Sequence, residues 1–124
     1  MRTEPKRIVI VAEDEVLIRM LATDTLASAG FNVVEAATAA EAVVALQEHV
    51  GNVAVLFTDV HMPGGVTGLE LVRFVRQKWS DIAILVTSGE GRPSVRELPS
   101  GSLFIAKPYR AERMVAHVNT LLGG

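Results

Sequence analysis

The sequence contains no cysteine, few aromatic residues and no long apolar run. The absence of cysteine excludes a disulfide framework. The strongest apolar runs, at 8–12, 53–57 and 82–86, are each about five residues, whereas a membrane-spanning helix needs about 20. Residues 2–7, which follow Met1, are polar and do not form the apolar segment of a signal peptide. We therefore expect a cytoplasmic protein without a membrane segment.

The basic residues form no run, and this fact together with the scarcity of aromatic residues argues against nucleic-acid binding. Acidic residues outnumber basic ones over 1–70, and the reverse holds over 71–124. This asymmetry suits an early cation site and a later basic partner surface, although solvated helix faces explain most single charges. The length of 124 residues, with 49% apolar and 21% charged residues, predicts a single globular domain over 1–124.

Short β-branched runs alternate with longer stretches of helical period, which is typical of βα units around a parallel sheet. We therefore predict an α/β fold whose five strands cover 7–12, 32–36, 53–58, 82–87 and 102–106. Several of these strands are apolar throughout, as expected for strands covered by helices on both faces.

Apolar residues at helical spacing predict the helices between these strands. They are Leu17, Met20 and Leu21 in the first helix, Ala39, Ala42, Val43, Leu46 and Val50 in the second, Val72, Val75 and Trp79 in the third, and Met114, Val118 and Leu121 in the last. The apolar faces of the third and last helices are expected to pack in the core. Gly30 and Gly51 are expected to end the first two helices. Segments 38–41 and 67–70 fit the capping-box spacing at the start of the second and third helices.

The fourth helix is predicted to be short or irregular. The segment 88–101 that should contain it holds three glycines and two prolines. Pro93 suits a first helical position, and Pro99 would stop the helix after one or two turns at 94–98.

Polar residues stand at the carboxyl ends of four predicted strands, where ligands collect in an open parallel sheet. They are Glu13, Asp14 and Glu15 after the first strand, Asp59 after the third, Thr87 and Ser88 at the fourth, and Lys107 after the fifth. Taken singly, each has a structural explanation, such as capping a helix or starting a turn. Together, the carboxylates would repel one another unless a cation neutralised them, and an oxygen site of this kind suits Mg²⁺.

Four segments in this order resemble the receiver domain of response regulators, the family typified by the bacterial chemotaxis regulator. They are residues 9–15, 57–64, 86–89 and 107–109. The resemblance covers nearly the whole chain. It implies a flavodoxin-like, doubly wound (βα)5 fold with a five-stranded parallel sheet in the order 2-1-3-4-5.

The resemblance also implies a phosphorylation site that contains Mg²⁺. Asp59 would be the phosphoacceptor and a metal ligand, Asp14 a direct ligand, Glu13 a ligand through water, and His61 a ligand through its backbone carbonyl. The chemistry agrees, because an aspartate that attacks phosphorus brings its charge close to the phosphoryl oxygens, and a metal and a lysine would hold these charges together.

The remaining roles implied by the resemblance concern the response to phosphorylation. Thr87 would hydrogen-bond the phosphoryl group, Lys107 would pair with it, and Phe104 occupies the aromatic switch position. The bond between Lys107 and Pro108 is expected to be cis. The turn at 62–68 is one residue longer than the common pattern of the family, and Phe104 lacks the hydroxyl of a tyrosine, so the output side departs most from the family.

The leading hypothesis is therefore a stand-alone switch that accepts a phosphoryl group from a sensor histidine kinase or a histidine phosphotransfer protein and then binds a downstream protein. Such a chain is not a conventional enzyme, but it catalyses its own Mg²⁺-dependent phosphorylation and autodephosphorylation. We expect a monomer or a weak, phosphorylation-dependent dimer. A phosphate sink, a relay, and a receiver excised from a hybrid kinase share this chemistry and remain alternatives.

Two alternatives come from other classes. A metal-dependent phosphatase with an aspartyl nucleophile would carry Asp-x-Asp at the first strand, where Val16 stands two residues after Asp14. A nucleotide or flavin module would need a phosphate-binding glycine loop, and the glycines at 64–68 do not have that spacing.

Overall fold

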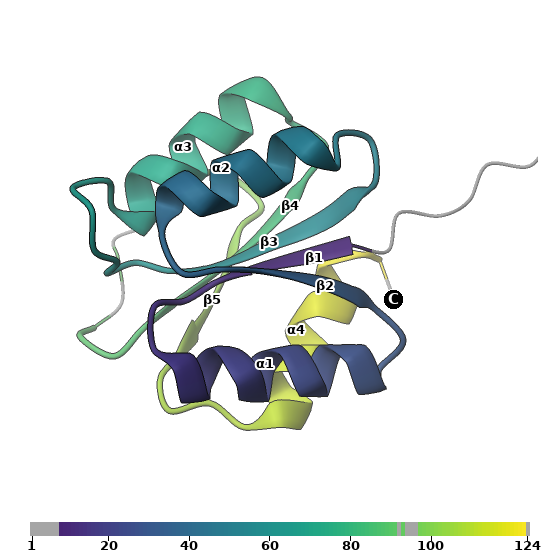
Figure 1. The fold of residues 1–124 in the computed structure, drawn as a ribbon. Helices are drawn as coiled ribbons and strands as arrows, with labels where there is room; N and C mark the ends of the chain where they lie inside the picture. Colours follow the sequence, from purple (N-terminus) through teal and green to yellow (C-terminus); the bar gives the residue numbers. More distant parts are fainter. Residues whose placement is uncertain (1–7, 92, 94–96, 124) are drawn as a thin grey trace, which may run out of the picture.

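Five parallel strands form the central sheet of the computed structural model, which describes residues 8–91, 93 and 97–123 (Figure 1). The strands are β1 (Ile8–Ala12), β2 (Asn32–Ala36), β3 (Val53–Asp59), β4 (Ala83–Ser88) and β5 (Leu103–Ala106). Their order, β2-β1-β3-β4-β5, confirms the predicted flavodoxin-like α/β fold. The predicted bounds are wrong by one residue at β3, β4 and β5, and residue 7 lies outside the described residues.

In the part of the chain that the structure describes, four helices cover the two faces of the sheet. They are α1 (Val16–Ser28), α2 (Ala39–Glu48), α3 (Gly68–Lys78) and α4 (Ala111–Leu121). Helices α2 and α3 lie on one face, and α1 and α4 lie on the other (Figure 1). The predicted short helix at 94–98 falls mostly outside the described residues. Among the helices that the structure describes, none is long and apolar enough to cross a membrane.

The central strands are buried because both of their faces are covered. All seven residues of β3 are buried, and its apolar side chains are divided between two apolar clusters, one on each face of the sheet. Leu56 packs on the side of α2 and α3, whereas Val55 and Phe57 pack on the side of α1 and α4. Each fully buried aliphatic side chain contributes about 1.5–3 kcal/mol relative to an exposed one. This two-sided burial explains the continuous apolar runs in the sequence.

Helix α1 forms as predicted, but the residues that identified it face outward. Leu17, Met20 and Leu21 are 74%, 50% and 68% exposed, while Ala22 and Leu26 make the buried contacts. Apolar residues lie on more than one side of α1, and only one side can contact the sheet. Packing through the small Ala22 brings the helix close to the sheet and leaves the larger side chains on the outer surface.

The predicted helix ends are largely confirmed. Gly30 and Gly51 follow α1 and α2 with positive φ angles of 98° and 90°, which glycine adopts without strain. The Thr67–Glu70 capping box is complete at α3. At α2, Thr38 caps the helix, but the Glu41 carboxylate accepts from the N–H of residue 37 and does not close the box. The second helix is shorter than predicted, since Val50 lies beyond its end and is exposed.

Candidate functional site

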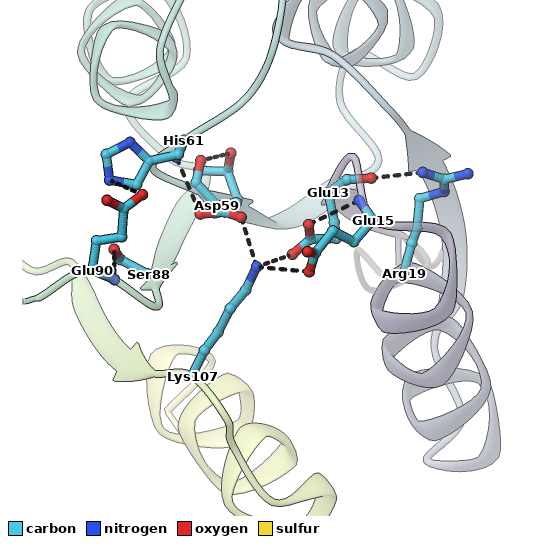
Figure 2. A network of polar contacts seen from close by, with 9 residues as sticks. Glu13, Glu15, Arg19, Asp59, His61, Ser88, Glu90 and Lys107 are labelled. Carbon is cyan, nitrogen blue, oxygen red and sulfur yellow. Dashed lines mark hydrogen bonds and ion pairs between the residues drawn. The ribbon is translucent and has the colours of Figure 1, made fainter.

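Three charged side chains meet at the carboxyl edge of the sheet. The Nζ atom of Lys107, just after β5, lies 2.6 Å from Oδ2 of Asp59 at the end of β3 and 2.6 Å from Oε1 of Glu13 after β1 (Figure 2). The two carboxylates are almost fully buried, at 5% exposed for Asp59 and 3% for Glu13. The strand order explains this meeting, because β1 and β4 flank β3 and the lysine reaches past β4.

The same edge holds a cluster of carboxylates with room for a cation. One oxygen each from Glu13, Asp14 and Asp59 lies within 4.8 Å of the others. Asp14 is exposed, whereas the other two are buried. Glu15 adds a fourth carboxylate 4.0 Å from Lys107 Nζ. The sequence analysis named Glu15 only as part of the acidic run and assigned it no role.

Burial and charge act in opposite directions on the two partners of this ion pair. Burial raises the pKa of Glu13, and the hydrogen bonds from Lys107 and from the Glu15 N–H only partly offset that effect. Burial alone would lower the pKa of Lys107, but its hydrogen bonds with Asp59 and Glu13 outweigh burial and raise that pKa above the ordinary lysine value. Lys107 is therefore a fixed positive charge at neutral pH.

Thr87 lies next to Asp59 in the sheet register, one strand away. Its side chain is buried, and its Oγ1 has no hydrogen-bond partner within the described parts of the chain. A buried hydroxyl without a partner is unfavourable by about 1–3 kcal/mol. Such a group is suited to bind an acceptor that arrives with a ligand.

His61 contacts the site through its backbone. Its N–H donates to Asp59 Oδ1 at 3.1 Å, while its ring points toward Glu90, with 3.7 Å between Nε2 and Oε2 (Figure 2). The imidazole therefore lies outside the carboxylate cluster. Glu90, which approaches from the loop after β4, was not identified from the sequence.

Phe104 and the Lys107–Pro108 bond occupy the expected region of β5 and the turn after it. Phe104 is half-buried and packs against the apolar cluster on the side of α2 and α3. The Lys107–Pro108 peptide bond is cis, as predicted.

Gly68 allows α3 to begin directly against the end of β3. Its N–H donates to the carbonyl of Val60 at 2.8 Å, and a Cβ atom at this position would overlap the backbone carbonyl of Asp59. The sequence analysis placed Gly68 in a capping box and in a glycine-rich turn, but did not identify this close approach. The glycine-rich turn is the one sequence signal of a close backbone approach there.

Comparison with known proteins identifies the family to which the chain belongs. The family model described as the response regulator receiver domain matches residues 9–119. The chain therefore belongs to the response regulator receiver domain family of two-component signalling.

Individual proteins are similar to the chain over most of its length. The chain is 32% identical over 117 residues to the sensor kinase CckA of Brucella abortus, covering 92% of this chain but only 12% of that kinase. It is 29% identical over 118 residues to the chemotaxis protein CheY of Bacillus subtilis, covering 92% of this chain and 96% of that protein. The solved structure of CheY4 from Vibrio cholerae aligns with a TM-score of 0.82 at 27% identity, over 93% of this chain and 98% of the other.

Proposed function

We propose that the chain is a phosphorylation switch in which Asp59 accepts a phosphoryl group from a phosphohistidine of a sensor kinase or a phosphotransfer protein. A carboxylate oxygen of Asp59 attacks phosphorus, the phosphorus–nitrogen bond to the histidine breaks, and an acyl phosphate forms. The observation that carries the proposal is the position of the Asp59 carboxylate, which lies against the Lys107 ammonium and within the acidic cluster.

The charge balance of the site supports Mg²⁺ as the cofactor. Among the described residues, Lys107 contacts three carboxylates, and Asp14 adds a fourth beside Glu13 and Asp59, so the cluster has excess negative charge before a phosphoryl group arrives. Carboxylate and carbonyl oxygens are the ligands that Mg²⁺ prefers. In this proposal Asp14 and Asp59 bind the ion directly, Glu13 binds through water, and His61 binds through its backbone carbonyl. When bound, the ion offsets the charges of the carboxylate and the phosphoryl oxygens.

The protein residues then hold the phosphoryl group and respond to it. Lys107 pairs with a phosphoryl oxygen and follows the new charge. Thr87 gains a hydrogen-bond acceptor that the unphosphorylated site does not offer, which is the differential interaction that a switch requires. Movement of Thr87 toward the site leaves space into which Phe104 turns, and this change in packing alters the partner-binding surface.

The outer surface of α1 supports a protein as the phosphodonor. Its apolar side chains begin directly after the acidic residues, and four of them are exposed: Val16, Leu17, Met20 and Leu21. A cavity of about 550 Å³ continues this surface between α1 and α4, where Lys107, Tyr109 and Met114 help to line it. Exposed apolar surface of this kind marks interaction sites. A donor that brings its histidine to Asp59 must cover the surface beside the site, so we assign this face to the donor.

Intact-mass measurement with a small-molecule phosphodonor such as acetyl phosphate tests the central proposal. We expect one phosphoryl adduct in Mg²⁺, little adduct in a chelator, and none with Asp59→Asn. Asp24→Asn, which removes an exposed carboxylate from α1, is the matched control and should react like the unaltered protein. An adduct that persists in Asp59→Asn, or that forms fully in the chelator, would remove the assignment.

A phosphate sink, a relay and the receiver of a longer kinase use the same site, so this experiment does not separate them. Phosphotransfer profiling against the histidine kinases of the source organism does, because it identifies the donor and shows whether phosphate moves onward to a second histidine.

A further inference from the structure

The side chain of Arg19 joins the acidic turn after β1 to the end of β2. From α1, its Nη1 donates to the backbone carbonyl of Glu13 at 2.7 Å (Figure 2). Its Nε donates to the Glu35 carboxylate at 3.0 Å. The Arg19 side chain is only 17% exposed, against 42% for Glu35. The guanidinium is therefore held at two points and largely removed from solvent.

The contact with Arg19 completes the immobilisation of Glu13. The Glu13 N–H donates to the carbonyl of Ala36 at 2.9 Å, and its carboxylate accepts from the Glu15 N–H and contacts Lys107. With its carbonyl also bound, the peptide group between residues 13 and 14 has one orientation. That orientation sets the direction in which the Asp14 side chain leaves the backbone.

Asp14 depends on this backbone because its own carboxylate is not held. The residue is exposed, and within the described ranges its side chain forms no hydrogen bond or ion pair. Yet its oxygen lies within 4.8 Å of those of Glu13 and Asp59. Only the backbone of the acidic turn keeps it there.

We propose that Arg19 is a positioning residue for the metal site. It holds the peptide group between Glu13 and Asp14 so that both carboxylates face the cation, and Glu35 in turn orients Arg19. The inference rests on the proposed function, since it concerns the same Mg²⁺ site. Substitution of a group that orients a metal ligand typically lowers metal affinity about 10- to 100-fold.

Charge and position predict opposite results, which makes the role measurable. Arg19 is a cation near a cluster that attracts Mg²⁺. If it acted through its charge alone, Arg19→Gln would remove a repulsion and tighten Mg²⁺ binding. If it acts by position, the same substitution releases the Glu13 carbonyl and weakens binding.

Calorimetric titration of the unphosphorylated protein with MgCl₂ separates the two. We expect Arg19→Gln to raise the Mg²⁺ dissociation constant about tenfold. Arg19→Lys should raise it similarly, because a lysine keeps the charge but cannot present two N–H groups in the guanidinium geometry. Arg73→Gln is the matched control: Arg73 is exposed on α3, forms no side-chain interaction within the described parts of the chain, and should bind as the unaltered protein does.

The role of Glu35 is tested by a double-mutant cycle. Glu35→Ala should weaken Mg²⁺ binding by a smaller factor than Arg19→Gln. The double variant should match Arg19→Gln alone, because Glu35 acts through Arg19 and has nothing to orient once the guanidinium is gone. Additive effects would overturn the part assigned to Glu35.

Thermal unfolding in a chelator gives the unfolding temperature of every variant, and each titration is run well below that temperature. If Arg19→Gln does not fold, Arg19→Lys carries the same test, both alone and combined with Glu35→Ala. Tighter binding in Arg19→Gln, or unchanged binding in both Arg19 variants, overturns the positioning role while the Mg²⁺ site stands. No Mg²⁺ binding by the unaltered protein overturns the proposed function itself.

Discussion

The ammonium of Lys107 lies 2.6 Å from the carboxylate of Asp59, although the two residues are 48 positions apart in the chain. The lysine is also 2.6 Å from Glu13, so one cation is shared by two buried carboxylates from different strands. In the proposed function, a phosphoryl group added to Asp59 would compete for the Lys107 ammonium and would change the partners of that lysine. Lys107 would then transmit the charge at Asp59 to β5.

We expect Lys107→Ala to accept a phosphoryl group but to respond poorly to it, because the charge on Asp59 no longer has a link to β5. Uptake is measured by intact mass, and the response by chemical-shift changes on adding beryllofluoride, which mimics the phosphoryl group. Lys78→Ala, which removes a lysine lying over Phe74 and Trp79 on the surface of α3, is the control. A full set of shift changes in Lys107→Ala would contradict this role.

Asp14→Ala should weaken Mg²⁺ binding more than Glu13→Ala does. Asp14 is exposed and is proposed to bind the ion directly, whereas Glu13 already contacts Lys107 and the Glu15 N–H and is proposed to act through water. Titration with MgCl₂ gives both dissociation constants. The reverse ranking would show that the two acids exchange roles.

The sequence predicted that Asp59 and Lys107 lie at one edge because both are tied to strand ends, and the carboxyl ends of parallel strands share an edge. Their direct contact depends in addition on the strand order, in which only β4 separates β3 from β5. Arg19, Glu90 and Gly68 were missed because their roles depend on distances between loops and helices. No spacing along the chain encodes such distances.

The orientation of α1 shows the same limit at the level of the fold. Leu17, Met20 and Leu21 have the period of a helix, and that period correctly predicts its existence. It does not say which side meets the sheet when apolar residues occur on several sides. Close packing through Ala22 decides that question, and it depends on the separation between helix and sheet.

Gly68→Ala should destabilise the protein by about 1–3 kcal/mol, the usual cost of forcing extra volume into a packed region. The added Cβ would overlap the Asp59 carbonyl, so the first turn of α3 must move away from Asp59. Urea unfolding measures the loss. Gly89→Ala is the matched control, because its Cβ would meet Lys107 at an ordinary 3.8 Å. Equal stability of the two variants would argue against the close approach.

Tyr109 should ionise unusually late in the folded protein. Burial, with the nearby charge of Glu13, raises its pKa from 10.0 to about 12. It is the only tyrosine, so absorbance at about 295 nm reports it alone. Because the folded-state pKa is the higher one, its contribution to the free energy of unfolding is complete below pH 10 and is lost as the pH rises through about 12. Tyr109→Phe should remove this part of the pH dependence. A midpoint near 10 in the folded state would contradict the prediction.

Leu21→Glu should slow phosphotransfer from the cognate kinase while leaving phosphorylation by a small phosphodonor unchanged. Leu21 is exposed on α1 and lines the cavity beside Lys107, so a charge there disturbs the proposed donor surface without entering the core. Its effect on the free energy of unfolding should stay within about 0.5 kcal/mol, as is usual for exposed positions. The kinase is the one identified by phosphotransfer profiling. The rates are compared with those of Val44→Glu, which changes another exposed apolar residue, on α2 (54% exposed, against 68% for Leu21). Equal slowing by both variants would mean that added negative charge, and not the α1 surface, impedes the donor. No slowing by Leu21→Glu would place the donor on another face.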